Sequence, residues 1–149
     1  RERTLPDVRR RAFRDIAPDA GPPRPHRTAG AMAVGAREVL VAWNVWLAER
    51  DLERARQVAA VVRGPHLRAL GLTVGDRVQV SMNLIAPDVV GPAEAWDAVT
   101  AHADAAGAEL VGLVPASVLE RTDPHRWAQL DIDEDRTIEA RLARAGSGG

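Results

Sequence analysis

The sequence predicts an α/β fold of the α+β sandwich type, because strand-like and helical hydrophobic patterns follow one another along most of the chain. Residues 77 to 84 alternate apolar with polar side chains, which is the pattern of a strand with one buried face. Residues 51 to 62 carry apolar side chains at helical spacing instead. At 149 residues, 46% of them hydrophobic and 28% charged, the chain is suited to one compact domain with a substantial core.

The first segment, residues 1 to 27, differs from the rest of the chain in composition. Residues 8 to 15 are basic and are interpreted as a helix end, and four prolines between residues 18 and 25 favour a loop or linker. We therefore separate this first region from a second region, which contains the regular elements.

The second region contains six elements in an order that defines a topology. Residues 38 to 47 form a valine- and tryptophan-rich run typical of a central strand, and the helix over residues 51 to 62 follows. Residues 67 to 74 and 77 to 84 are predicted as a hairpin that turns at Gly75 and Asp76. A second helix is predicted from Gly91 and Pro92 to a closing Gly107, followed by a strand over residues 109 to 114.

Strand, helix, strand, strand, helix, strand is the βαββαβ order of ferredoxin-like folds, in which a four-stranded sheet carries both helices on one face. The other face is left open. The first and third strands are neighbours in this topology, so Asn44 is expected near Gln79, Ser81 and Asn83. Trp46 is expected on the same face, suited either to stack on a flat ring or to pack against a partner sheet. A second copy of the chain could equally cover the face, with the polar residues as interface hydrogen bonds.

The end of the chain is predicted to contain an irregular tail, a solvated acidic run and a helix. The acidic run over residues 131 to 135 is interpreted as a link to a helix over residues 136 to 145.

Composition excludes several classes of function. A net charge of −1 argues against a domain-wide attraction for nucleic acid or anionic lipid. All 20 basic residues are arginine and cysteine is absent, which excludes Schiff-base lysines, thiol nucleophiles and cysteine-bound metals. The four histidines lack zinc-site spacing, so no metal is expected. No apolar run is long enough to span a membrane, and a cytoplasmic location is the default expectation. The start at arginine rather than methionine suggests that an upstream part is missing.

Five ordered segments together resemble the glutamate formiminotransferase family. They are P-D-A-G-P-P-R-P-H-R-T-A-G-A-M-A-V-G-A-R, L-V-A-W-N-V-W-L, R-A-L-G-L, V-Q-V-S-M-N-L and E-L-V-G-L-V-P, which span residues 18 to 115. The family's transferase unit consists of two α/β subdomains whose sheets face one another with folate between them. The resemblance implies that residues 1 to 33 are the end of the N-terminal subdomain with the folate-contacting loop. Residues 34 to 149 would be the C-terminal subdomain with a helical tail.

The resemblance also implies an enzyme, a formimidoyltransferase that moves the formimino group from N-formimino-L-glutamate to tetrahydrofolate in histidine degradation. Tetrahydrofolate is then a co-substrate, and the N-terminal formiminotransferase subdomain is a partner. The family's catalytic histidine belongs to that subdomain, so no catalytic residue is assigned here and the chain is expected to be incomplete alone. The alternatives are a non-catalytic folate-binding module and a dimerisation module, which would form a homodimer.

Folate contacts are implied for the residues that match the family pattern P-D-x-G-P and its continuation. These are Asp19, Gly21, Pro22 and Pro23. Proline fixes the backbone, glycine allows close approach, and a carboxylate can accept hydrogen bonds from a pterin. Family members commonly carry an aromatic residue where this chain has Ala20. Without the resemblance, Asp19 and Gly21 would be read as turn residues.

Substrate contacts are assigned to polar residues at the start of the first strand and on the open face. These are Arg37, Asn44, Ser81 and Asn83. The guanidinium of Arg37 is suited to a two-pronged contact with a substrate or folate carboxylate, and its alternative is an ion pair with Glu38.

Overall fold

A computed structural model describes residues 3 to 146, and it divides the chain into two compact units, residues 1 to 37 and 38 to 149. The subdomain boundary predicted after residue 33 concerns a longer enzyme and stays a prediction. The described residues contain no helix that is long and apolar enough to cross a membrane.

Over its described residues, the first unit contains one helix, α1 (Leu5–Arg11), and a long irregular segment. Thr4 caps the helix, because its hydroxyl accepts a hydrogen bond from the Asp7 backbone N–H at 3.3 Å. Residues 17 to 25 form bends without helix or strand, as their prolines predict.

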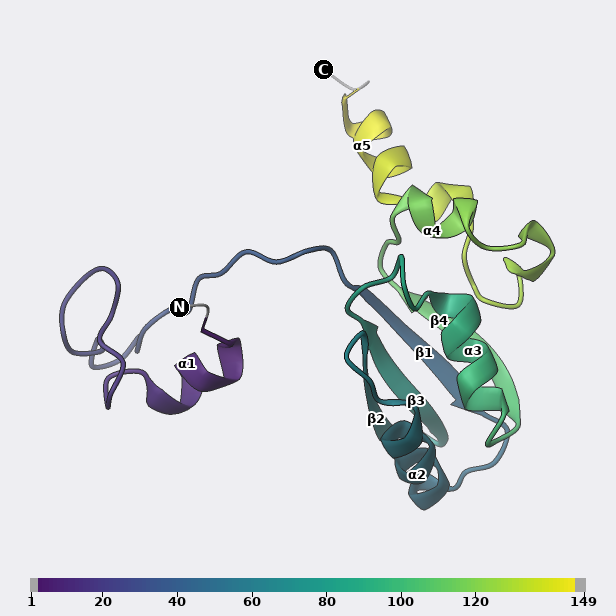
Figure 1. The fold of residues 1–149 in the computed structure, drawn as a ribbon, viewed down its shortest axis with the longest axis horizontal. Coiled ribbons are helices and arrows are strands. Elements are labelled where there is room, and N and C mark those ends of the chain that lie inside the picture. Colours follow the sequence, from purple (N-terminus) through teal and green to yellow (C-terminus); the bar gives the residue numbers. More distant parts are fainter. Residues whose placement is uncertain (1–2, 147–149) are drawn as a thin grey trace. The chain divides into compact units, whose positions relative to one another are not determined.

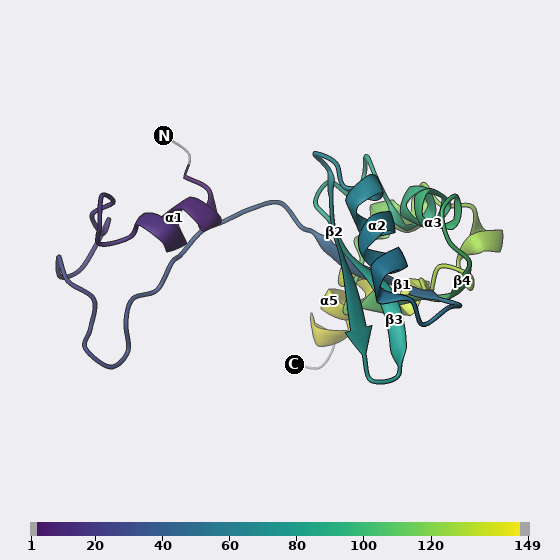
Figure 2. The same ribbon diagram turned by 90° about the horizontal axis from the view of Figure 1, so that it is seen from below.

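The second unit is built on a four-stranded antiparallel sheet with the order β2-β3-β1-β4 (Figure 1). Its strands are β1 (Val41–Leu47), β2 (Leu67–Val74), β3 (Arg77–Leu84) and β4 (Ala105–Val111). The helices α2 (Leu52–Val62) and α3 (Pro92–Thr100) connect them, and they pack against the sheet and each other (Figure 2). This arrangement confirms the predicted ferredoxin-like α+β sandwich.

The core lies between the sheet and these two helices. Trp43 and Val45 of β1, Val80 of β3, Ala59 of α2 and Val99 of α3 are all fully buried. Helix α2 approaches β2 closely at Gly71, where a Cβ atom would lie 2.4 Å from the backbone nitrogen of Arg56. Glycine at this position therefore lets the two backbones touch.

The predicted second helix and fourth strand have the wrong boundaries. Helix α3 ends at Thr100, and Gly107 lies inside β4 rather than closing the helix. Residues 105 to 111 pair with β1, whose second edge would otherwise leave its N–H and C=O groups unpaired. This long-range pairing overrides the helix preference of an alanine-rich segment. The first strand also begins at Val41, three residues later than predicted.

The segment after β4 contributes to the core, which corrects the interpretation of the acidic run as a solvated link at Asp131 and Ile132, whereas residues 133 to 135 are exposed. It contains the short helix α4 (Ala116–Glu120), two 3-10 turns, η1 (Pro124–Arg126) and η2 (Glu134–Arg136), and helix α5 (Ile138–Gly146). Leu130 and Ile132 are buried, at 0% and 3% exposed. The buried indole N–H of Trp43 donates to the Leu130 carbonyl at 2.9 Å.

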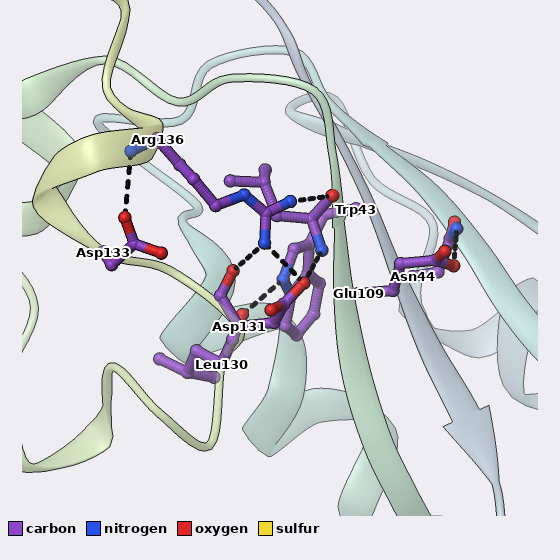
Figure 3. A network of polar contacts seen from close by, with 8 residues as sticks. Trp43, Asn44, Glu109, Leu130, Asp131, Asp133 and Arg136 are labelled. Carbon is purple, nitrogen blue, oxygen red and sulfur yellow. Dashed lines mark hydrogen bonds and ion pairs between the residues drawn. The ribbon is translucent and has the colours of Figure 1, made fainter. Parts of the chain in front are cut away.

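The same segment closes the outer edge of β4 (Figure 3). The Leu110 backbone N–H donates to Oδ2 of Asp131 at 2.8 Å, and the guanidinium of Arg136 donates to the Leu110 carbonyl. Arg136 also pairs with Asp131 at 2.8 Å. The outward N–H and C=O groups of Leu110 on this edge strand are thereby satisfied without a further strand.

Candidate functional site

The face of the sheet opposite α2 and α3, here called the open face, is defined by three rows of cross-strand neighbours. One row is Leu70, Ser81, Asn44 and Glu109, and the next is Leu72, Gln79, Trp46 and Gly107. The third row is Arg68, Asn83, Ala42 and Val111. Directly opposed residues share a face, so the pairing of β1 with β3 brings Asn44 and Ser81 together, with Asn83 one row away. The expected grouping of these residues on one face is present.

Asn44 lies at the centre of this face and is already engaged. Its Nδ2 donates to Oε2 of Glu109 at 3.0 Å (Figure 3). Asn44 is only 6% exposed. Glu109 was not anticipated as a site residue, although the alternation of β4 would have placed it opposite Asn44 once the register was known. A charged acceptor fixes the orientation of the amide, so the Asn44 oxygen is the atom left to accept from a ligand.

Gln79, in the neighbouring row, has an unsatisfied polar atom. The residue is 6% exposed, and its buried Oε1 has no hydrogen-bond partner among the described residues. Beside it the guanidinium of Arg77 lies 4.1 Å from the ring centroid of Trp46, a cation–π contact. One face of the Trp46 ring is therefore occupied by Arg77 within this chain.

A cavity of about 410 Å³ lies at the β2 edge of the sheet. Its walls come from both faces of β2 and β3 and from the end of α2, and they include two predicted substrate residues, Ser81 and Asn83. A volume of this size suits a small molecule.

The predicted folate residues lie in the first unit, and all four are exposed. Asp19 is 3.4 Å from the guanidinium of Arg3, with 92% of its side chain exposed. Gly21 has φ +86°, a left-handed conformation that favours glycine and suits the turn interpretation of this residue. Arg37 is also exposed and is the last residue of the first unit.

The histidines are exposed, and His26 has a local role. Its Nδ1 accepts backbone hydrogen bonds from Thr28 at 3.3 Å and Ala29 at 3.1 Å, which organises the turn that follows. Among residues 3 to 146, no group of three or more histidine and acidic side chains is placed to hold a metal ion.

The fold and the open face define a ferredoxin-like domain with a sheet surface of mixed polar and apolar side chains, suited to a ligand or a facing domain. No family model matches the sequence. Glutamate formimidoyltransferase of Streptococcus pyogenes serotype M1 is 35% identical over 136 residues, which cover 83% of this chain and 46% of that protein. Glutamate formimidoyltransferase of Thermoplasma acidophilum is 29% identical over 142 residues, covering 87% of this chain and 46% of the relative.

The chain thus spans about half the length of the curated relatives it matches. It is related to the glutamate formimidoyltransferases over most of its own length, and this similarity confirms the family resemblance seen in the sequence.

Proposed function

We propose that this chain is the C-terminal subdomain portion of a glutamate formimidoyltransferase, which acts in cytoplasmic histidine degradation. In the reaction, the formimino carbon leaves the nitrogen of N-formimino-L-glutamate and bonds to N5 of tetrahydrofolate. The N5 proton is lost and the glutamate nitrogen gains one. The similarity of 35% over 136 residues to a transferase of that name is the observation that carries this proposal.

The open face would contribute substrate contacts. Ser81 and Asn83 line the cavity beside it, and the Asn44 amide is oriented by Glu109. Hydroxyl and amide groups can donate to and accept from a formimino or amide group without adding charge. Arg37 is proposed to pair with a carboxylate of the substrate or of folate.

The loop would hold tetrahydrofolate through four residues, Asp19, Gly21, Pro22 and Pro23. The exposure of all four supports availability to a ligand, and the positive φ of Gly21 supports a fixed turn. Ala20 removes a side chain on which a ring could stack, so we expect weaker folate affinity than in relatives with an aromatic residue there.

Proton transfer is assigned to the other half of the enzyme, the N-terminal subdomain. The role of this chain is to bind and orient the reactants, since correct positioning alone can supply a large part of a rate enhancement.

The test is complementation. The chain is mixed with the N-terminal half of the Streptococcus pyogenes relative, and glutamate released from N-formimino-L-glutamate in the presence of tetrahydrofolate is measured. We expect release only when both pieces are present, and a loss of about tenfold or more for Ser81→Ala combined with Asn83→Ala. Arg121→Gln, at an exposed arginine outside the open face, is the control. Folded, associated pieces that release no glutamate would contradict the proposal.

A second candidate function, a homodimerisation module, is favoured by apolar exposure on the open face. Leu70, Leu72, Val74 and Val111 are 58%, 39%, 48% and 51% exposed. Such side chains together on one face mark an interaction surface. Sedimentation equilibrium tests this function: a dimer that Leu70→Glu converts to a monomer would support it, and a monomer at all concentrations would exclude it.

A further inference from the structure

Two arginines that the proposed function leaves without a role line the cavity at the β2 edge. Arg68 lies on the open face directly opposite Asn83, and Arg63 follows the last turn of α2. The two cations therefore reach the cavity from different layers of the fold.

Arg63 is held in place through only part of its guanidinium. Its Nε donates to the Ala69 carbonyl at 2.7 Å, on the edge strand. Neither its terminal amino groups nor the guanidinium of Arg68 makes an ion pair or hydrogen bond with any of residues 3 to 146. Most of the donors on both guanidinium groups are thus available to a ligand.

The cavity carries positive charge without an internal counter-charge. No aspartate or glutamate is among its described lining residues, which are Arg63, Gly64, Leu67, Arg68, Ala69, Leu70, Ser81, Met82 and Asn83. Two cations that approach one concave space attract an anion, and planar guanidinium groups suit carboxylates.

We infer that this cavity is a glutamyl-binding subsite, in which Arg63 and Arg68 bind the two carboxylates of the ligand. Ser81 and Asn83 supply neutral hydrogen bonds between them. The apolar walls, which include Leu67 and Leu70, suit the methylene groups of a glutamyl side chain better than they suit a bare phosphate. Arg63 and Arg68 then become specificity-determining residues.

The inference rests on the proposed function for its choice of ligand. A glutamyl group can come from N-formimino-L-glutamate or from the tail of folate. Two probes separate these sources: N-acetyl-L-glutamate resembles the first, and N-(4-aminobenzoyl)-L-glutamate is the tail of the second. Inorganic phosphate tests whether any anion suffices.

The experiment is an NMR titration of the whole chain with each probe, following backbone amides of the cavity residues. We expect N-acetyl-L-glutamate or the tail fragment to bind with a dissociation constant of about 1 mM, typical of small charged fragments. Arg68→Gln should weaken binding about tenfold or more. Arg121→Gln removes the same charge from an exposed arginine outside the cavity and should leave binding within about twofold. Because Arg63→Gln also removes the bond to Ala69, Arg68→Gln is the decisive variant.

Preference for one probe identifies the source of the glutamyl group and supports the subsite. Absence of shifts in the cavity at about 10 mM of both probes would overturn it. Equal affinity of the Arg68→Gln and Arg121→Gln variants for the glutamyl probes would also overturn it. So would binding of inorganic phosphate with the same affinity as these probes. The proposed function fails separately, because complementation without glutamate release leaves this titration unaffected.

Discussion

Asn44 and Glu109 are joined across β1 and β4 by a hydrogen bond of 3.0 Å, from the amide nitrogen of one to a carboxylate oxygen of the other. Asn44 is only 6% exposed, so its hydrogen bond to Glu109 is largely shielded from water. Asn44 is neutral, so the pair places no second charged group next to the Glu109 carboxyl group.

Asn44→Asp should therefore destabilise the fold near neutral pH. Two carboxylates at this separation cannot both ionise without repulsion, so the pKa of one is raised in the folded state. Stability linked to a raised carboxyl pKa is present at low pH and is lost as pH rises through the folded-state pKa. We expect a loss of about 1 to 3 kcal/mol at pH 7 that shrinks near pH 4.5, measured by urea unfolding.

Asn83→Asp is the matched control, because Asn83 is exposed and makes no contact with an acid among the described residues. An equal loss of stability in both variants would contradict the specific role of Glu109.

Gly71→Ala should destabilise the second unit. The new Cβ would lie 2.4 Å from the Arg56 nitrogen and 2.6 Å from the Ala55 carbonyl carbon, and these backbone atoms cannot move without displacing α2 from β2. Overpacking of this kind costs about 1 to 3 kcal/mol. Gly107→Ala in β4 is the control, since no heavy atom lies within 4 Å of its added Cβ. Thermal unfolding of the two variants compares them, and equal midpoints would refute the close packing at Gly71.

Gln79→Met should stabilise the chain by about 1 kcal/mol, because it removes a buried acceptor that has no partner and keeps the side-chain length. The measurement is the free energy of unfolding in urea. If Gln79 serves a facing subdomain or ligand, the same variant loses activity in the complementation assay while gaining stability alone. A destabilised variant would show that the Gln79 side chain already makes useful contacts.

The parts of the fold that sequence could predict depend on short-range patterns. Strands β2 and β3 have the predicted boundaries, since both alternate and the turn between them places Gly75 at φ +61°. The boundaries of β4 were predicted wrongly because its alanine-rich residues also suit a helix, and the pairing with β1 decides their structure. The contact of Asp131 with Leu110 joins residues 21 apart in sequence, which no local pattern encodes.

The candidate site divides in the same way. The grouping of Asn44 with Ser81 followed from topology, because the first and third strands are adjacent in a βαββαβ sheet. Placing Glu109 opposite Asn44 requires the register of β4, which the sequence does not give. Sequence patterns do not predict that Arg63 and Arg68 line the same cavity. This depends on where α2 ends relative to β2, which the close packing at Gly71 helps to set.

Asp7 provides a prediction about pH in the first unit. The hydrogen bond from the Thr4 hydroxyl, with further contributions from Arg10, lowers the pKa of Asp7 below its ordinary value of 3.8. A lowered carboxyl pKa favours the folded helix above pH 3.8, and this contribution is lost as pH falls through the folded-state value. Thr4→Val keeps the shape of the side chain and removes the hydroxyl. An NMR titration of the Asp7 carboxyl carbon should show its midpoint moving up toward 3.8 in this variant. Arg10→Gln should move it less, because the Thr4 hydrogen bond is the larger influence. An unchanged midpoint in Thr4→Val would show that the hydrogen bond from the Thr4 hydroxyl to the Asp7 carboxylate is not formed in solution.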